Sequence, residues 1–399
     1  MSGIHTSGGI WPVHPKPKED ELLSSWLARL AMAHGQKLHT FCSIAWPGKA
    51  IWNRDLDKSA GAEILQSLSK RTGTPYERVR TTTLASYEGV LYERYNKLGP
   101  AAWIMPVGVY HRTRRRFGLQ YCPYCLADDP EPYYRRKWRL AFMTICEWHG
   151  VPLRDRCHQC GAAVNFHRGE MGDYKKFIVI SLTLCYACGH DLRELVGSTY
   201  TNDASPSPVT SAEVAFTKGL LGALGSGIVR ISESVTTYSV LYFAGLRHLM
   251  SILAMGDKRV ERLRQAVGEA YGVETFSPST PPRPDVQEMD VAARRRVLAY
   301  VRCLLEEWPE RFIELSRHHK VWSSVWLRHM GPDPKGRKSA APFWLWSVIH
   351  DHLYRARYCP SDEEMRAAVR HLAQKKQRIN KTQLSQLIGV AVIRRQGVL

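Results

Sequence analysis

The sequence lacks a long uninterrupted apolar run. Its best apolar stretch, residues 341–349, is about half as long as the 18 or so residues that a membrane-spanning helix needs, and residues 220–229 are interrupted by glycine. Residues 1–20 contain no apolar segment like the core of a secretory signal peptide. We therefore expect a cytoplasmic protein with no membrane partner, whose cysteines are not paired in disulfides.

Recognisable catalytic motifs are also missing. Residues 331–339, GPDPKGRKS, differ from a phosphate-binding loop because Arg337 stands where lysine would have to follow Gly336, and two prolines remove backbone amides that would bind phosphate. No group of carboxylates for two-metal phosphoryl transfer is recognisable. The sequence therefore predicts a protein that is not an enzyme.

Histidines in the C-terminal part suggest one catalytic alternative. His318 with His319, and the run His350, Asp351 and His352, could bind a metal ion in a zinc-dependent nuclease. Neighbouring residues on a helix point in different directions, however, so we interpret these histidines as surface and capping residues. A nuclease would require DNA cleavage that depends on the histidines at 350 or 352.

Acidic residues are few relative to basic ones. The chain has 37 Asp and Glu against 56 Lys and Arg, which gives a formal net charge of +19 and a pI near 9.6. Such an excess favours a polyanionic partner but does not distinguish DNA from RNA. With 399 residues, of which 44% are hydrophobic, the chain is long enough for two or three domains with hydrophobic cores.

Cysteine, in contrast, is present in an ordered pattern. Eight Cys and His residues form four pairs, with two residues between the members of each pair. A turn of this spacing directs two ligand atoms at one ion, and two such turns complete a closed tetrahedral site. The sequence therefore predicts two structural Zn²⁺ ions per chain. The pairs are Cys122 and Cys125, Cys146 and His149, Cys157 and Cys160, and Cys185 and Cys188.

The spacing leaves the grouping of these pairs open. The simplest grouping is sequential, with the first two pairs on one ion and the last two on the other, but an interleaved grouping has the same spacing. His158 and His190 stand beside ligand cysteines and are second choices as ligands. Disulfides would require export, and thioredoxin-like redox chemistry uses a single C-x-x-C motif beside a βαβ unit, so both fit less well.

Basic and aromatic residues alternate near the first pair. Tyr133, Tyr134 and Trp138 are interleaved with arginine and lysine, and such clusters can hold phosphate oxygens and stack on bases. The alternative is that the arginine stems pack on these aromatic rings inside the zinc module. The residues considered for nucleic-acid contact are Arg112, Arg114, Arg115, Arg116, Arg135, Arg136, Lys137 and Arg139.

Apolar spacing predicts several helices. Residues 23–30 place leucine and tryptophan on one helical face after a proline-rich extended arm, residues 11–17. Asp20 is the expected N-cap of this helix and Gly35 its expected end. Residues 62–84 and 379–392, the latter with Gly389 at the turn, resemble helix-turn-helix units, although any helical hairpin has the same pattern.

The expected fold is mainly α with a small amount of β. It consists of a helical N-terminal domain, two tandem zinc modules with short β-hairpins, and a helical C-terminal domain with a helix-turn-helix-like unit. Polar residues at 197–212 and four prolines at 276–285 predict linkers. The expected segments are residues 1–117, 118–197, 213–272 and 286–399.

These features together resemble the TniQ family, the group that includes TnsD of Tns-type transposons. The resemblance is close over about the first two hundred residues and loose beyond them. It implies a target-selection adaptor of DNA transposition that lacks transposase chemistry, and it assigns the same eight metal ligands. It rests on the segments PVHPKPKEDELLSSWLARLAMAHG, YCPYCLADDPEPYYRRKWRLAFMTICEWHG, VPLRDRCHQCG and LLEEWPERF.

The resemblance also implies partners. Similar proteins link a chosen DNA site to the transposon's AAA+ ATPase, a TnsC- or TniB-like protein, and we expect the arm and the first helix, with Trp11 and Trp26, to face that ATPase. TnsD-like members read DNA directly and are longer. Others dock on an RNA-guided Cascade complex, often as homodimers, and a Tni-type group serves further transposons. The length of this chain fits the last two groups better.

One alternative from another class remains. A stand-alone, zinc-containing regulator that binds a specific DNA sequence would have the same modules and the same net charge. It would recognise a defined operator and would need no ATPase. An adaptor, in contrast, is expected to be encoded beside transposase and ATPase genes.

Overall fold

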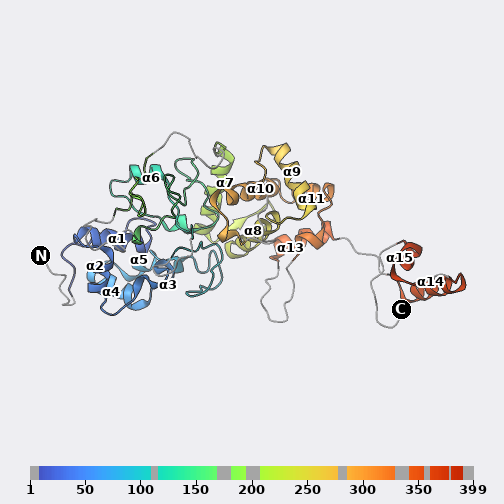
Figure 1. Ribbon diagram of the computed structural model, residues 1–399, viewed down its shortest axis with the longest axis horizontal. Coiled ribbons are helices and arrows are strands. Elements are labelled where there is room, and N and C mark those ends of the chain that lie inside the picture. Colours follow the sequence, from blue (N-terminus) through green and yellow to red (C-terminus); the bar gives the residue numbers. More distant parts are fainter. Residues whose placement is uncertain are drawn as a thin grey trace. The chain divides into compact units, whose positions relative to one another are not determined.

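The computed structural model describes residues 9–108, 116–168, 181–194, 207–276, 285–328, 341–354, 360–376 and 379–389 (Figure 1). It confirms the expected fold, which is mainly helical with little β-structure. Contacts divide the chain into two compact units, Met1–His352 and Leu353–Leu399. The four segment boundaries expected from the sequence stay predictions.

Short helices make up the first part of the larger unit. They are α1 (Leu23–Ala33), α2 (Leu38–Ala45), α3 (Leu56–Ser59), α4 (Ala62–Thr72) and α5 (Tyr76–Arg80), with 3₁₀ turns η1 (Ile51–Asn53) and η2 (Leu84–Tyr87). Helix α1 buries Trp26 and Leu27 completely, as its apolar face predicts. Its start differs from the expectation: Leu22 is the N-cap residue, because the Asp20 carboxylate instead accepts a hydrogen bond from Arg136.

The arm, residues 11–17, is fastened to these helices. The backbone N–H of Trp11 donates to the carbonyl of Arg71 at 2.7 Å, near the end of α4. The indole N–H of Trp26 donates to the carbonyl of Pro15, also at 2.7 Å. Trp11 packs edge-on against Phe41 of α2 and is only 2% exposed. The arm is therefore part of the N-terminal core.

Helices α4 and α5 form the helix pair expected within residues 62–84. Gly73 ends α4 at a φ of +60°, a left-handed conformation that glycine adopts without steric cost. Pro75 then stands at the N-cap of α5, and Leu65, Leu68 and Val79 turn inward. Whether this pair contacts DNA stays a prediction.

The cysteine-rich region contains little regular structure. Its helical pieces are α6 (Pro123–Asp128) and the turns η3 (Arg136–Arg139) and η4 (Phe166–Arg168). The expected β-hairpins are reduced to isolated antiparallel bridges, because each chain reversal is held by a tight turn at a ligand pair and not by a ladder. The bridges are Tyr121↔Arg154, Ile145↔Pro152, Arg156↔Ala163 and Leu184↔Asp191.

Longer helices form the second part of the larger unit. They are α7 (Ser211–Ser226), α8 (Ser239–Leu253), α9 (Lys258–Tyr271), α10 (Val291–Leu305), α11 (Glu310–His318), α12 (Ser323–Trp326) and α13 (Phe343–Leu353), with the 3₁₀ turn η5 (Val286–Glu288). The helical segment expected at 213–272 is interrupted by an antiparallel hairpin of β1 (Ile228–Arg230) and β2 (Thr236–Tyr238). Among the described residues, no single helix is both long and apolar enough to cross a membrane. Helices α8 and α9 reach that length and composition only when taken together, and the chain bends by 101° between them.

Buried contacts join the two parts of this unit. The indole N–H of Trp103 donates to the carbonyl of Phe243 on α8 at 3.2 Å, and both rings pack against Phe142. Arg294 on α10 is fully buried and donates to the carbonyl of Ala141 at 2.6 Å and to Gln120 at 2.9 Å. The helices α8 and α10 therefore support the cysteine-rich region directly.

The smaller unit is a helix pair. Helices α14 (Asp362–Gln374) and α15 (Lys381–Ile388) enclose a small core of Met365, Ala368, Leu372 and Leu384. Of the unit expected at 379–392, α15 is the first helix, and Gly389, at a φ of +81°, ends it at the expected turn. The second helix of that unit would follow Gly389. Residues 390–399 lie outside the described residues.

Candidate metal centres and basic cluster

Two clusters each bring four ligand residues together. Site 1 consists of Cys122, Cys125, Cys146 and His149, and site 2 of Cys157, Cys160, Cys185 and Cys188. In each site the four ligand atoms all lie within 4.8 Å of one another. The structure thus groups the pairs sequentially and selects this grouping over the interleaved one.

The dimensions of site 1 fit a tetrahedral zinc ion. Nδ1 of His149 lies 3.5, 3.3 and 3.4 Å from the sulfurs of Cys122, Cys125 and Cys146, and the last two sulfurs are 3.6 Å apart. Zinc bonds of about 2.3 Å to sulfur and about 2.0 Å to nitrogen place tetrahedral ligand atoms about 3.5–3.8 Å apart. The observed separations agree within a few tenths of an ångström.

A carboxylate orients the histidine of site 1. Nε2 of His149 lies 2.9 Å from an oxygen of Asp128. This contact favours a proton on Nε2 and leaves the Nδ1 lone pair directed at the sulfurs, an arrangement common around zinc. Sequence reasoning missed Asp128, although its position three residues after Cys125 places both on the same face of α6.

Site 2 is built from four cysteines. The sulfurs of Cys157 and Cys188 are 3.7 Å apart, and those of Cys160 and Cys185 are 3.6 Å apart. Cys160 and Cys188 are exposed, whereas all three cysteines of site 1 are buried. The second-choice ligands, His158 and His190, pack against each other with ring centroids 4.2 Å apart and lie outside the four-ligand group.

Three of the four ligand pairs share one backbone turn. The residue after the second ligand is Gly150, Gly161 or Gly189, with a φ of +59°, +68° or +75°. In each case its N–H donates to the carbonyl of the first ligand of the pair at 2.9 Å. Glycine is favoured there because a Cβ atom disfavours positive φ. This repeated glycine is a sequence signal that supplements the ligand spacing.

Two arginines of the basic cluster lie in the interior. Arg139 is fully buried, with its guanidinium 2.5 Å from Asp55 and 3.2 Å from Asp57. Arg135 is 4% exposed, and it binds Asp129 through two hydrogen bonds of 2.9 and 3.0 Å. Its guanidinium also lies over the ring of Trp138. This arrangement matches the packing alternative and leaves neither arginine accessible to a phosphate group.

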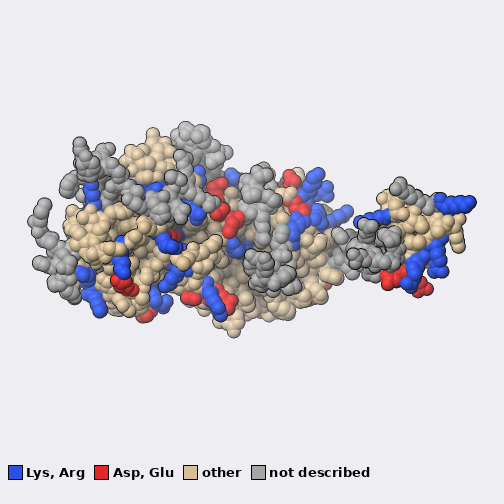
Figure 2. Space-filling view, turned by 60° about the horizontal axis from the view of Figure 1, so that its bottom comes forward, with Lys and Arg blue, Asp and Glu red and all other residues tan. Residues whose placement is uncertain are grey.

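The other two cations within residues 135–139, Arg136 and Lys137, are also paired with carboxylates. Arg136 lies 3.1 Å from Asp20, and the Lys137 ammonium lies 2.7 Å from Glu147. The same ammonium stands 3.8 Å from the ring centre of Trp148, whose side chain is 58% exposed. Figure 2 shows Lys and Arg interspersed with Asp and Glu on one face of the larger unit, without one continuous basic patch there.

The remaining predicted contact residues have different positions. Arg112, Arg114 and Arg115 lie outside the described residues, whereas Arg116 is half-buried. Among the residues that the structure describes, no carboxylate pairs with Arg116. The two tryptophans expected to face a partner, at positions 11 and 26, are 2% and 0% exposed, so their indoles are core groups and cannot contact a partner in this conformation.

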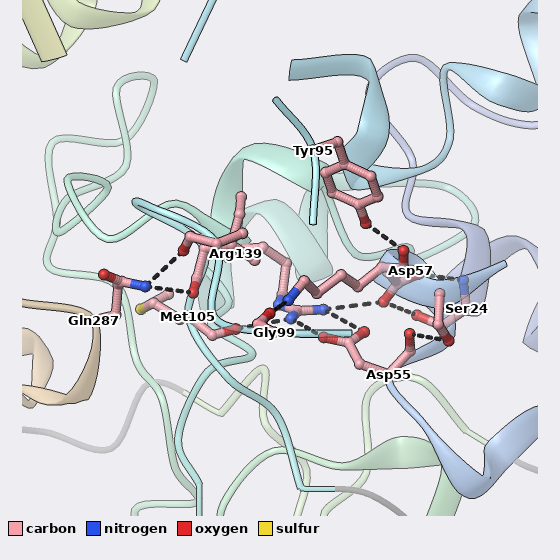
Figure 3. Close-up of polar contacts among 12 residues, drawn as sticks. Ser24, Asp55, Asp57, Tyr95, Gly99, Met105, Arg139 and Gln287 are labelled. Atoms are coloured by element: carbon pink, nitrogen blue, oxygen red, sulfur yellow. Dashed lines mark hydrogen bonds and ion pairs between the residues drawn. The ribbon is translucent and has the colours of Figure 1, made fainter. Parts of the chain in front are cut away.

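A buried ionic network was not expected from the sequence (Figure 3). The Arg139 guanidinium lies between Asp55 and Asp57, and Ser24 donates its backbone N–H and its hydroxyl to Asp57 at 2.7 and 2.8 Å. Burial raises the pKa of Asp57 to about 6; the charge of Arg139 opposes this shift and that of Asp55 adds to it. The Arg139 guanidinium therefore forms ion pairs with both carboxylates.

This raised pKa predicts a specific pH dependence of stability. A carboxyl group with a higher pKa in the folded state favours folding most at low pH, and this contribution is lost as the pH rises from about 4 to about 6. Replacing Asp57 by Asn should remove it. We expect the free energy of unfolding of the native protein to fall by on the order of 2 kcal/mol relative to the variant over that range. Urea titrations of both proteins at matched pH would measure the difference. Acid affects the metal ligands of both proteins equally, so that effect cancels in the comparison. If the free energies of unfolding of the two proteins changed in parallel with pH, the prediction would be contradicted.

The C-terminal histidines do not form a metal site with other described residues. His350 lies on α13, exposed, with Nδ1 2.8 Å from the carboxylate of its neighbour Asp351. Within the described ranges, sites 1 and 2 are the groups of three or more potential ligands close enough to share an ion. The structure thus gives the nuclease alternative no support.

Part of the chain matches a known protein family. Residues 12–153 match the model of the TniQ family, which confirms the resemblance expected from the sequence. The matched segment includes most of the arm, helices α1 to α6 and all four ligands of site 1. No curated protein sequence is significantly similar to the chain.

Proposed function

Residues 12–153 belong to the TniQ family, and from this premise we propose that the protein selects target sites for DNA transposition, as an adaptor that neither cuts nor joins DNA. The family match is the observation that carries the proposal. It includes the elements that build the N-terminal core and the first ligand cluster together, not an isolated cysteine motif. The net charge of +19 is consistent with a nucleic-acid or ribonucleoprotein partner.

Both clusters are proposed to hold Zn²⁺ in a structural role. Four protein ligands complete a tetrahedral site, so no coordination position is left for water or a substrate. Three cysteines with one histidine, or four cysteines, are typical structural zinc ligands. At site 1 the ion would fix α6 against the turn at Cys146, and at site 2 it would join the turns at Cys157 and Cys185.

The proposed partners are those that the resemblance to the TniQ family implies. The adaptor would link its target to an AAA+ transposition ATPase, and it would find that target either by contacting DNA or by docking on an RNA-guided Cascade complex as a homodimer. With the cations at 135–139 paired inside the fold, Arg112, Arg114 and Arg115 are the better candidates for phosphate contact. Their charges are close together in the sequence, which suits a phosphate backbone.

An insertion assay with the transposon's own proteins tests this function. We expect insertions at the selected site to fall to background when this protein is omitted, and the purified protein to retain the ATPase in a pull-down. Supercoiled plasmid incubated with the protein and divalent metal should stay uncut. Unchanged insertion without the protein, or nicking by the protein alone, would overturn the proposal. Binding to a defined operator without any effect on insertion would favour the stand-alone regulator.

A further inference from the structure

A large open cleft lies in the larger unit, away from both metal sites. Its volume is about 990 Å³. Its walls come from three parts of the chain: residues 53–59 around α3, the loop at 97–108 with residue 116, and residues 285–288 around η5. Hydrogen bonds from Gln287 to the carbonyls of Ala101 and Ile104 hold the last two walls together. The second and third walls of the cleft are thus joined directly.

Three cations in the cleft have no partner among the described residues. Arg54 and Lys97 are exposed, and Arg116 is half-buried. They come from three different segments, so no local helix or turn explains their convergence. In contrast, the cations at 135–139 are all paired with carboxylates.

The carboxylates of the cleft are mostly committed to other cations. Asp55 is paired with the buried Arg139 (Figure 3). Asp285 lies 3.0 Å from Arg247. The third, Glu288, also has a partner. The unpaired charge in the described part of the cleft is therefore positive, which favours an anionic ligand.

The other lining residues distinguish between classes of anion. Leu98, which is 73% exposed, lies in the cleft with Ile104, Met105 and Val107. Among the described lining residues there is no aromatic ring on which a base could stack, and stacking is the main source of affinity for single-stranded nucleic acids. Arginine clusters beside apolar surface suit a peptide that carries both acidic and apolar side chains.

We propose that this cleft binds an acidic, partly apolar peptide segment of a partner protein. Its carboxylates would pair with Arg54, Lys97 and Arg116, and its apolar side chains would cover Leu98 and the neighbouring apolar wall. The inference rests on the proposed adaptor function, because an adaptor must hold a protein partner as well as a target. It assigns that contact to the cleft and not to the buried tryptophans of the arm and α1.

Fluorescence anisotropy of the full-length, zinc-loaded protein tests the cleft. The probe is a fluorescein-labelled peptide of alternating glutamate and leucine with blocked ends. We expect it to bind, and the variant Arg54→Glu, Lys97→Glu, Arg116→Glu to bind it at least about tenfold more weakly. The matched control, Lys218→Glu, Lys258→Glu, Arg262→Glu, changes three exposed cations outside the cleft and should stay within about threefold of the native protein.

Several outcomes would overturn the inference. If both triple variants bound the peptide equally weakly, the overall charge of the protein would be what attracts the peptide. If the native protein did not bind the peptide at all, the proposed site would not exist. The protein is also tested with single-stranded and duplex DNA. If the cleft cations were needed for DNA binding but not for peptide binding, the cleft would be a nucleic-acid site. Zinc content and thermal unfolding establish that each variant is folded. If the triple variant were not folded, the single variants Arg54→Glu and Lys97→Glu, both at exposed positions, would be used instead. Each should weaken peptide binding about threefold.

The insertion assay separates this inference from the proposed function. A cleft variant that loses the peptide but still directs insertion would overturn the role of the cleft and leave the adaptor function intact. Insertion that does not require the protein at all would overturn the adaptor function, whatever the cleft binds.

Discussion

Replacing Cys125 by Ser is expected to lower the zinc content of the purified protein from two ions to one and to unfold the region around site 1. Cys125 contributes one of three buried sulfurs, and its sulfur lies 3.3 Å from Nδ1 of His149. Structural zinc sites couple roughly 10 kcal/mol or more of binding free energy to folding. Elemental analysis gives the metal ratio, and circular dichroism during heating gives the change in stability.

A buried cysteine outside the metal sites provides the control. Cys303 on α10 is fully buried and is not a member of either cluster. Cys303→Ser should cost some stability but keep two zinc ions, because it changes packing and no ligand. Two ions retained in the Cys125 variant, or a native protein that is folded without metal, would refute the assignment of site 1.

Replacing Arg139 by Met is expected to destabilise the protein by about 3–5 kcal/mol. The side chain of Met can occupy much of the same space, but Asp55 and Asp57 would lose their shared cation. Carboxylates left without a cation in the interior cost far more than a lost surface ion pair. The midpoint of urea unfolding, measured at neutral pH, reports the change.

Two further variants isolate the cause. Arg80→Met removes an ion pair with Glu77 that is largely exposed, and it should cost no more than about 1 kcal/mol. Adding Asp55→Asn and Asp57→Asn to Arg139→Met removes the uncompensated charges and should recover much of the lost stability. If the triple variant were as unstable as Arg139→Met alone, packing and not charge would be the role of Arg139.

Local patterns predicted helix α1 and the two groups of Cys and His residues. Helix α1 follows from apolar residues at helical spacing, and the ligand pairs follow from two-residue separations that a tetrahedral ion requires. Spacing could not select the sequential grouping, because the choice depends on which turns face each other in space. The hairpin of β1 and β2 was missed because three residues per strand give no measurable alternation.

The basic cluster shows where sequence reasoning reaches its limit. Residues 135–139 have the composition of a nucleic-acid contact, yet Arg139 pairs with Asp55 and Asp57, which precede it by 84 and 82 residues. A sequence shows how many charges are adjacent along the chain, but not which of them are neutralised by distant partners. The same holds for Trp11, whose neighbours Phe41 and Trp46 are brought to it by folding.

The contacts of Arg294 with Ala141 and Gln120 have a consequence for the boundaries of the family segment. Residues 12–153 do not bury all of their apolar side chains by themselves, because Trp103 and Phe142 are covered by Phe243 of α8. A fragment ending at residue 153 would present those two rings to water and leave Gln120 without its guanidinium partner. The span recognised by similarity therefore depends on α8 and α10 to cover part of its apolar surface.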